Sequence, residues 1–497
     1  MVDIVVLRKP SLIARGHCRE REGPGKAGKD RFVDRGAPMA HTRNTKLEAA
    51  IGEAGWSQAQ TARHVARVAA EAGVSELSGT TRSHINQWIR GAQPSGKAPR
   101  ILCETLSRGL GRTITLAEIG LTGDQGGPVA SWGADPLSAL VDTTGKDLDM
   151  ERRQILTGTA YSVAGLILPD PAWWEQVPRQ ARERRPTTTR SVDAGDVESV
   201  REMVAFFSRR DQRRGGGDAR SALVAYLRTD IATYLNGRFL TEQVRQHMFT
   251  AAGEAAYLAG WTAFDAGEHS LAQEYFTLAV RLAAEAEDAP LTGHILRAMA
   301  HQAVDLGHTR AAVTLAGASL ERGRYTQASR REKALLGVVH ARSLAAAGRK
   351  QDALNALLRA EDDLSNARED DDEPGRVWFF AEASLAHETA CTLRDIADLP
   401  AAEREFRRSV RTRRQQAFAR THSVTLGYLG AIQAQQGSLE AACATWNQAL
   451  DAMGGIHSGR ARDTVVQMRR ALSPFRRRGN PAATDLDARA RTVLAVG

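Results

Sequence analysis

The sequence predicts an all-α protein in which a compact helical bundle precedes a helical-repeat array, or α-solenoid. Long stretches rich in Ala, Leu, Arg and Glu favour helices over strands, and aromatic residues make up only 5% of the chain. Near the N-terminus, apolar residues recur at helical spacing in short segments. From residue 219 onward, a pattern of small and large residues repeats itself.

The length, charge and cysteine content limit the classes of protein to consider. The 497 residues exceed what one compact core supports, so we expect two or more domains or an elongated array. The formal net charge of +9 makes an anionic partner plausible without identifying it. The 4 cysteines, Cys18, Cys103, Cys391 and Cys443, form no CxxC pair, which favours a reduced intracellular protein. No apolar run approaches the ~20 residues that cross a bilayer, so we expect a cytoplasmic protein without membrane contact.

Two segments resemble targeting or extension sequences. Residues 1–42 lack a helical or strand period and are expected to form a disordered extension, with translation beginning at Met39. The pair Arg152-Arg153, followed by the apolar Tyr161–Leu168, resembles a twin-arginine export signal. Because such a signal must lie at the extreme N-terminus, we interpret this segment as an internal helix.

Residues 43–122 are expected to form a bundle of short helices. The first helix ends at Gly55, and Ser57 is a suitable N-cap for the second. A third helix should cover Thr81–Arg90 and a fourth about Lys97–Gly109. The expected inward residues of these helices and of a final turn are Leu47, Ala50, Ile51, Ala62, Val65, Ile85, Trp88, Ile89, Ile101, Leu102, Leu106, Leu110, Ile114, Ile119 and Leu121.

Residues 123–218 are expected to form a linker with irregular helices. Gly, Pro, Asp and Ser cluster over Gly123–Asp135. Prolines then interrupt the helical pattern at Pro169, Pro171, Pro178 and Pro186. We interpret Gly215-Gly216-Gly217 as a hinge between this region and the repeats.

Residues 219–455 carry an internal repeat, and a C-terminal helix and tail should follow over 456–497. The repeat is anchored by turn positions at Gly267, Gly307, Gly348, Ala397 and Gly437. Five positions later a small residue occurs, namely Ala272, Ala312, Ala353, Ala402 or Ala442. Nine positions after the anchors are Phe276, Ala316, Leu357, Phe406 and Trp446. Twelve positions after them are Ala279, Ser319, Ala360, Ser409 and Ala449.

This pattern is typical of stacked helix pairs. Gly lets the chain reverse between two helices, Ala permits close helix approach, and the larger residue fills the gap between neighbouring pairs. The pattern resembles the tetratricopeptide repeat (TPR), although its period of about 40 exceeds the usual ~34. Such an array is expected to bind a protein, a peptide or another copy of the chain. The alternative is an irregular helical domain with an accidental register of alanines.

The third predicted helix has the residue types of a base-reading helix. Arg forms paired hydrogen bonds with guanine, and Asn or Gln with adenine. Amides at the start of the preceding helix could bind phosphate, and the basic residues after the third helix, including Arg100, would add charge contacts. The residues expected to contact DNA are Gln58, Gln60, Thr81, Arg82, Ser83, Asn86, Gln87, Arg90 and Lys97.

Several stretches of this region resemble a known family. Gly55–Gln58, Ile85–Pro94 and the Leu-rich fourth helix resemble the phage-repressor-type (Cro-type) helix-turn-helix, with Arg67–Leu77 as extra material between its two characteristic helices. Together with Leu106–Thr115 and Glu118–Leu121, they resemble actinobacterial regulators that combine such a bundle with TPR-like repeats. The resemblance implies an N-terminal helix-turn-helix bundle followed by a TPR-like α-solenoid. It also implies a DNA-binding transcriptional regulator that acts on double-stranded DNA as a homodimer.

No motif in the sequence points to catalysis. The chain has no Walker or Rossmann phosphate loop, no Gly-x-Ser-x-Gly elbow and no HExxH spacing, so we expect no enzyme activity, cofactor or metal. The acidic run Glu369–Glu373 is interpreted as a solvated loop between repeats. The alternative to a DNA-binding regulator is a TPR-type interaction scaffold that does not bind DNA.

Overall fold

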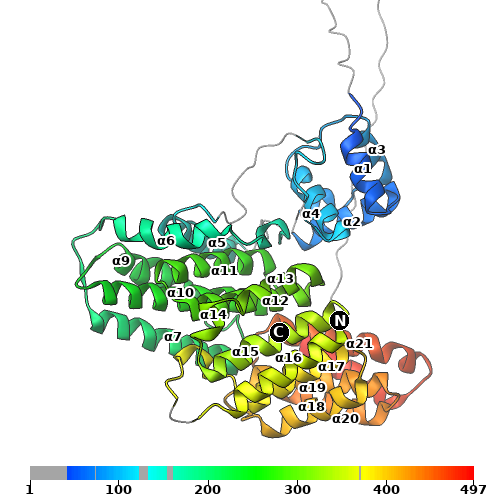
Figure 1. Cartoon of the computed structure of the whole chain (residues 1–497). Helices are drawn as coiled ribbons and strands as arrows, with labels where there is room; N and C mark the ends of the chain where they lie inside the picture. The colour runs from blue at the N-terminus through cyan, green and yellow to red at the C-terminus, as the bar shows by residue number, and fades with distance from the viewer. Residues whose placement is uncertain are drawn as a thin grey trace, which may run out of the picture. The chain divides into compact units, whose positions relative to one another are not determined.

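The computed structural model describes residues 42–72, 74–112, 114–121, 132–153, 161–368 and 371–496. Within these ranges the fold is all-α, and two short strands form the only sheet (Figure 1). The predicted fold class is therefore confirmed. The expected extension, apart from Thr42, lies outside the described residues, as do residues 123–131 of the expected linker and residues 154–160 after Arg153.

The N-terminal bundle follows the sequence prediction closely. It consists of α1 (Thr45–Glu53), α2 (Gln58–Glu71), the 3-10 turn η1 (Ser75–Leu77), α3 (Arg82–Ile89) and α4 (Ala98–Leu110). Their apolar faces form a separate core, because each helix is amphipathic and buries one side. That core includes Leu47, Ile51, Val65, Ile85, Ile89, Leu102, Leu106, Ile114, Ile119 and Leu121.

The connection between the bundle and the repeats contains more regular structure than expected. It comprises α5 (Pro136–Arg153), η2 (Ala164–Leu166), α6 (Pro171–Glu183), β1 (Ser191–Val192), the long α7 (Ala194–Arg214), α8 (Arg220–Tyr226), the π-helical η3 (Leu227–Ile231), α9 (Ala232–Leu235) and β2 (Arg238–Phe239). The strands pair in parallel, with Ser191 opposite Arg238. Pro171 is the first residue of α6, where a helix tolerates proline, but Pro178 lies inside α6 and does not interrupt it as predicted.

The hinge interpretation of Gly215–Gly217 is wrong. The Gly216 N–H donates to Asp265 Oδ2 at 3.0 Å, and the Gly217 N–H donates to the His457 carbonyl at 3.1 Å. A Cβ on Gly216 would lie 2.4 Å from the Thr262 carbonyl oxygen. These glycines therefore permit close backbone packing at a fixed contact.

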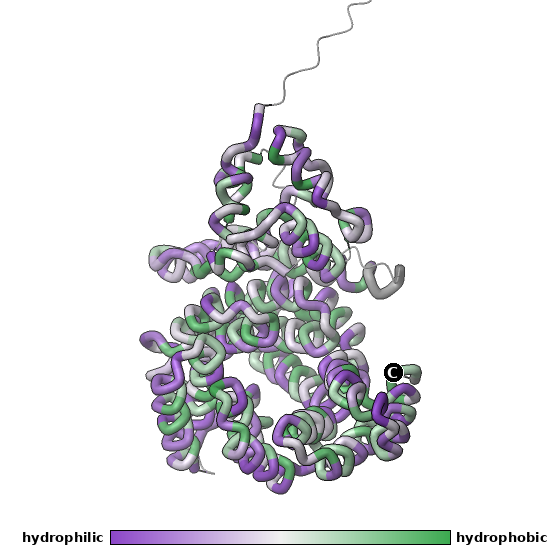
Figure 2. The backbone as a smooth tube through the Cα atoms, turned by 90° about the vertical axis from the view of Figure 1, so that its right-hand side faces the viewer, coloured by the Kyte–Doolittle hydropathy of each residue, from purple (hydrophilic) through white to green (hydrophobic). Residues whose placement is uncertain are grey.

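The repeats form successive helix pairs (Figure 1). The pairs are α10 (Glu242–Asp265) with α11 (His269–Glu285), α12 (Ala289–Asp305) with α13 (Thr309–Ser319), α15 (Arg330–Ala346) with α16 (Lys350–Ser365), α17 (Glu382–Asp395) with α18 (Leu399–Thr412), and α19 (Ala419–Gln435) with α20 (Leu439–Ala452). The short α14 (Gly323–Thr326) and η4 (Gly375–Val377) interrupt the series. Polar and apolar residues alternate along most of these helices (Figure 2).

The predicted repeat register is confirmed. All the turn anchors have positive φ, including the one that is not glycine: Gly267 (+86°), Gly307 (+79°), Gly348 (+77°), Ala397 (+65°) and Gly437 (+85°). The small and large residues that follow each anchor are all buried. The repeat is therefore a structural unit, because the same turn geometry and the same packing positions recur in each pair.

The C-terminus forms a sixth helix pair where a helix and a tail were expected. It consists of α21 (Gly459–Arg477) and α22 (Pro481–Val496), and Gly479 between them has φ +76°. Ala483, Leu486 and Ala490 of α22 are buried. The Asp487 carboxylate of α22 is fully buried and bonded to arginines of α21. The array therefore continues almost to the end of the described chain.

A set of polar contacts joins the beginning of the repeat region to its end. The guanidinium of Arg420 on α19 donates to Asp211 Oδ2 of α7 at 3.0 Å and to Asp265 Oδ1 of α10 at 3.1 Å. The contact between Gly217 and His457 lies beside them. We refer to Asp211, Gly217, Asp265, Arg420 and His457 as the terminal clamp. It connects residues more than 200 positions apart, such as Asp211 and Arg420, whose separation is 209.

Candidate nucleic-acid interface

Helix α3 begins with a well-defined cap. Thr81 is the N-cap residue, and its backbone N–H donates to His84 Nδ1 at 3.0 Å. The Thr81 hydroxyl also lies 3.1 Å from His84 Nδ1. Such a cap satisfies an N–H group that the helix itself cannot, and it fixes where α3 starts. Thr81, predicted as a DNA-contacting residue, is exposed.

The two faces of α3 differ sharply in burial. Ile85, Trp88 and Ile89 point into the bundle core, with Ile85 fully buried. The opposite face carries a polar stripe, made up of Arg82, Ser83, Asn86, Gln87 and Arg90. Its members are spaced as neighbours on one side of a helix, and all are exposed except Asn86, which is half-buried. The structure thus brings most of the predicted base-contacting residues together on one surface.

The polar stripe has no partners within the described part of the chain. None of its side chains forms a hydrogen bond or ion pair there. Elsewhere on the bundle, arginines are ion-paired: Arg43 with Glu48, Arg67 with Glu71, Arg108 with Glu71 and Glu104, and Arg112 with Glu53 and Glu118. Carboxylates therefore neutralise these four arginines elsewhere on the bundle, while the charges of Arg82 and Arg90 remain available to an external anion.

The predicted phosphate contacts on α2 are only partly free. The Ser57 N–H donates to Gln60 Oε1 at 2.8 Å, and the Gln60 N–H donates to Ser57 Oγ at 3.3 Å, which together form a capping box. The side-chain oxygen of Gln60 is thus engaged in the cap, and its amide nitrogen is the group left to bind phosphate. Gln58, the first residue of α2, is half-buried.

Basic residues lie at both ends of the α3–α4 connection. Arg90 is the C-cap of α3, and Lys97 occupies the N-cap position of α4. Both are exposed, and neither forms an ion pair with a described residue. Arg63 on α2 is likewise exposed and without an ion pair to a described residue, and the sequence analysis did not predict it as a DNA contact. Its position one helical turn after Gln60 could have indicated that it lies on the same face as the predicted phosphate contacts.

Apart from residue 73, which lies outside the described residues, the extra material between α2 and α3 forms helical and turn structure. Arg67–Glu71 extends α2, and Ser75–Leu77 forms η1. Val74 is buried in the bundle core and its N–H donates to the Ala69 carbonyl at 2.8 Å. The connection is therefore longer than in a minimal helix-turn-helix, but it is packed against the same core as α3.

A tight contact between Trp56 and α4 closes the bundle. A Cβ on Gly109 would lie 2.3 Å from Trp56 Cη2, so only glycine allows this approach. The other face of Trp56 stacks on His64, with ring centroids 4.2 Å apart. Desolvation, together with the charges of Arg67 and Arg63, lowers the pKa of His64, so the neutral ring is favoured in the stack.

Other kinds of site receive no support from the described residues. None of the helices among them combines the length and apolar character needed to cross a membrane. Over the same residues, no group of three or more His, Cys, Asp or Glu side chains is arranged to hold a metal ion. Cys103, Cys391 and Cys443 are unbridged.

Comparison with known proteins gives limited matches. The family model described as the SP15 N-terminal domain matches residues 47–122, which is close to the extent of the bundle. No curated protein sequence matches this chain. Among solved structures, the crystal structure of Rap protein complexed with competence and sporulation factor matches with a TM-score of 0.38 and 12% sequence identity. That match covers 72% of this chain and 98% of the other.

Proposed function

We propose that this chain is a DNA-binding transcriptional regulator. Residues 43–121 would bind a double-stranded DNA operator through α3, and the repeat array would mediate protein or peptide interaction or dimerisation. The resemblance of the bundle to Cro-type helix-turn-helix domains supports this proposal. The observation that carries it is the polar stripe, which is exposed and unpartnered among the described residues and flanked by cations without ion pairs.

The dimensions of α3 suit the major groove. With its side chains an α-helix is about 10–12 Å across, which matches the ~12 Å width of that groove in B-DNA. Arg82 is the first residue of α3, the end of a recognition helix that usually contacts base edges. Arg82 would bind guanine O6 and N7, while Asn86 and Gln87, one turn later, would bind adenine N6 and N7.

The flanking groups would set the orientation of α3 on the duplex. The N-terminus of α2 presents backbone N–H groups and the Gln60 amide nitrogen toward a phosphate. Arg90 and Lys97 would contact phosphates on the other side of the groove. These contacts add affinity that depends on salt and not on sequence.

The repeat array would supply the regulatory input. A groove of about 1040 Å³ is lined by α7, by α10 and by residues 372–379. A ligand that binds one arrangement of the repeats better than another would shift the population of that arrangement. In a dimer, such a shift would change the spacing of two α3 helices and hence the affinity for paired half-sites.

Selection from random duplexes with the full-length chain tests the proposal and supplies the operator. Arg82→Ala should weaken operator binding by about 1–3 kcal/mol and relax the base preference at one position. Arg82→Lys keeps the charge but lacks the planar fork, so it should lose base discrimination while retaining the salt dependence. Lys97→Ala should weaken all duplexes alike and reduce the salt slope by about 1.

Arg112→Ala is the matched control, because it removes the same charge from a guanidinium that is already ion-paired with Glu53 and Glu118. Operator binding by this variant should change little. Equal losses for Arg82→Ala and Arg112→Ala would reject α3 as the reading helix. A folded chain that binds no duplex at low salt would instead support the interaction scaffold.

A further inference from the structure

A small cavity lies among the first helices of the repeat pairs. Its volume is about 60 Å³. The walls include Trp261 of α10, Arg297 of α12, Val339 of α15, His387 of α17 and Thr421 of α19. Arg460 of α21 also lines it, so all six helix pairs contribute and the cavity depends on the stacking of the whole array.

Arg413, which follows α18, is a buried cation in the wall of this cavity. Only 7% of the residue is exposed. Its Nη2 donates to the Ala383 carbonyl at 2.8 Å and to Ser409 Oγ at 3.0 Å, but its Nε has no hydrogen-bond partner among the described residues. No carboxylate of those residues lies within ion-pair distance of Arg413. A buried guanidinium without a counter-charge is costly, so its retention calls for an external anion.

The other groups around the cavity do not neutralise Arg413. Arg420 is already bound to Asp211 and Asp265. Arg297 is 2% exposed and likewise has no ion pair, and its Nη2 donates to the Tyr257 hydroxyl at 2.8 Å. Burial and the charge of Arg420 lower the pKa of Arg413 to about 10, as expected for a cation that lacks a partner.

The neighbouring histidines do not add charge. Burial, followed by the charges of nearby arginines, holds the pKa of His301 and of His387 well below the ordinary range. Both rings are therefore neutral at pH 7. Glu388 also lines the cavity, but it lies within 3.3 Å of Arg342 and pairs with that residue.

We propose that this cavity binds the carboxylate of a ligand, with Arg413 and Arg297 as its cationic partners. The inference rests on the part of the proposed function that gives the repeat array a ligand-binding role. A cavity of about 60 Å³ has the volume of about two water molecules, so it admits one carboxylate group and little more. A carboxylate is favoured over phosphate, because the flat three-atom group needs less of this small volume than a tetrahedral group does.

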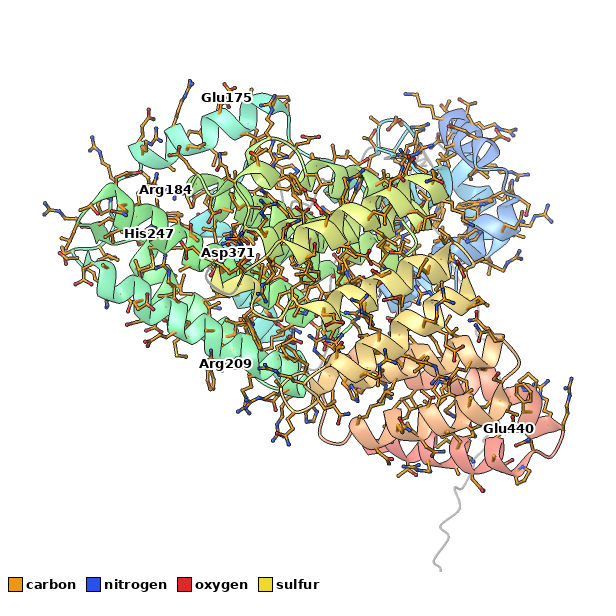
Figure 3. The ribbon with its side chains drawn as sticks, turned by 60° about the horizontal axis from the view of Figure 1, so that its bottom comes forward. Glu175, Arg184, Arg209, His247, Asp371 and Glu440 are labelled. Atoms are coloured by element: carbon orange, nitrogen blue, oxygen red, sulfur yellow. The ribbon has the colours of Figure 1, made fainter. Side chains whose placement is uncertain are left out.

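The adjoining groove indicates what the rest of the ligand is like. The cavity and the groove of about 1040 Å³ share Gln212, Trp261 and Phe379 as lining residues. Glu198, Glu202, Asp288 and Asp372 line the groove, together with Arg209 and His247. Figure 3 labels Arg209 on α7 and His247 on α10. A molecule with its carboxylate in the cavity would therefore carry neutral or cationic groups along the groove. A free carboxylic acid and the C-terminus of a short peptide both present this chemistry.

Thermal unfolding of the full chain tests the carboxylate site without DNA, so it can fail independently of operator binding. Acetate replaces chloride at constant ionic strength, with acetamide as the neutral isostere and inorganic phosphate as the competing anion. Once the acetate concentration exceeds that needed to fill the site, each further tenfold rise should raise the unfolding midpoint by about 1–2 °C, and acetamide should not. Random tripeptides, tested once with free C-termini and once amidated, show whether the natural ligand is a peptide or a small acid. Tighter binding of the peptides with free C-termini indicates a peptide. A response to acetate but to neither peptide mixture indicates a small acid.

Arg413→Met should abolish the acetate response. The matched control is Arg281→Met, which removes a guanidinium that is 3% exposed, also unpaired and not part of this cavity. Ser384→Met provides a second test should Arg413→Met fail to fold, because it fills the cavity from a partly exposed position and leaves Arg413 in place. An acetate response that survives Arg413→Met or Ser384→Met, or a larger response to phosphate than to acetate, would overturn the proposal.

Discussion

Replacing Ala397 with glycine should stabilise the protein, although most glycine substitutions destabilise helical proteins. Ala397 is the one repeat anchor with a side chain, and its φ is +65°. The left-handed conformation costs an L-residue about 1–2 kcal/mol. Glycine removes that cost but gains freedom in the unfolded chain, which costs about 0.4–1 kcal/mol. The net expectation for Ala397→Gly is a stabilisation of about 0.5–1 kcal/mol.

The equivalent glycine in the preceding repeat supplies the reverse experiment. Gly348 has φ +77°, and a Cβ built on it would meet nothing within 4 Å. Gly348→Ala should therefore destabilise by a similar amount, through backbone strain alone and without a steric clash. Because both positions are exposed at the surface of the array, neither change alters the core.

Thermal unfolding of the two single variants and of the double variant measures both effects. The midpoint should rise by about 0.5–1 °C for Ala397→Gly and fall by about 0.5–1 °C for Gly348→Ala, and the changes should cancel in the double variant. A lower midpoint for Ala397→Gly would refute the reasoning, because it would mean that the alanine methyl contributes more than the strained backbone costs.

Two further predictions concern the bundle and the interior of the array. Gly109→Ala should destabilise the bundle by about 1–3 kcal/mol, because the new Cβ would lie 2.3 Å from Trp56. Gly79→Ala is the control, because a Cβ there would meet nothing within 4 Å. Equal denaturation midpoints for the two variants would contradict the packing argument. His294→Gln should reduce the amount of unfolding free energy that the protein loses as the pH falls. Burial lowers the pKa of His294 to about 3 from its ordinary 6.5, so the unfolded chain binds the extra proton, and stability falls as the pH drops through that window. Between pH 7 and 5 this histidine should account for about 2 kcal/mol, measurable by urea unfolding, and a pH dependence unaltered by the substitution would count against it.

The features that local sequence could predict are those that depend on local geometry. The repeat anchors were predictable because a chain that reverses between two helices requires the left-handed region, which favours glycine. The burial of Ile85, Trp88 and Ile89 followed from their spacing on one helix. Gln60 was predicted as a phosphate contact, but Ser57 three residues earlier is the start of a capping box, and that signal favours a helix cap.

The features that were missed depend on contacts between distant segments. Three consecutive glycines predict a flexible segment at Gly215–Gly217. The segment is packed because Thr262 and His457, which are distant in sequence, lie against it. Arg413 belongs to an arginine-rich stretch that looks solvated, and its burial arises because α17, α18 and α19 surround it. The pair α21–α22 lacks the repeat spacing after Gly479, so the repeat pattern predicts five of the six pairs. The DNA-contacting role of the polar stripe remains a prediction.

The terminal clamp changes how the repeat array should respond to stress. In an open array, each repeat touches only its neighbours, so the outermost pair can unravel while the centre stays folded. Here Arg420 connects α19 to α7 and α10, and the His457 carbonyl accepts a hydrogen bond from the Gly217 N–H after α7. Loss of either end would expose the buried carboxylates of Asp211 and Asp265 without their arginine. We therefore expect the array to melt as one cooperative unit and to transmit a disturbance at one end directly to the other.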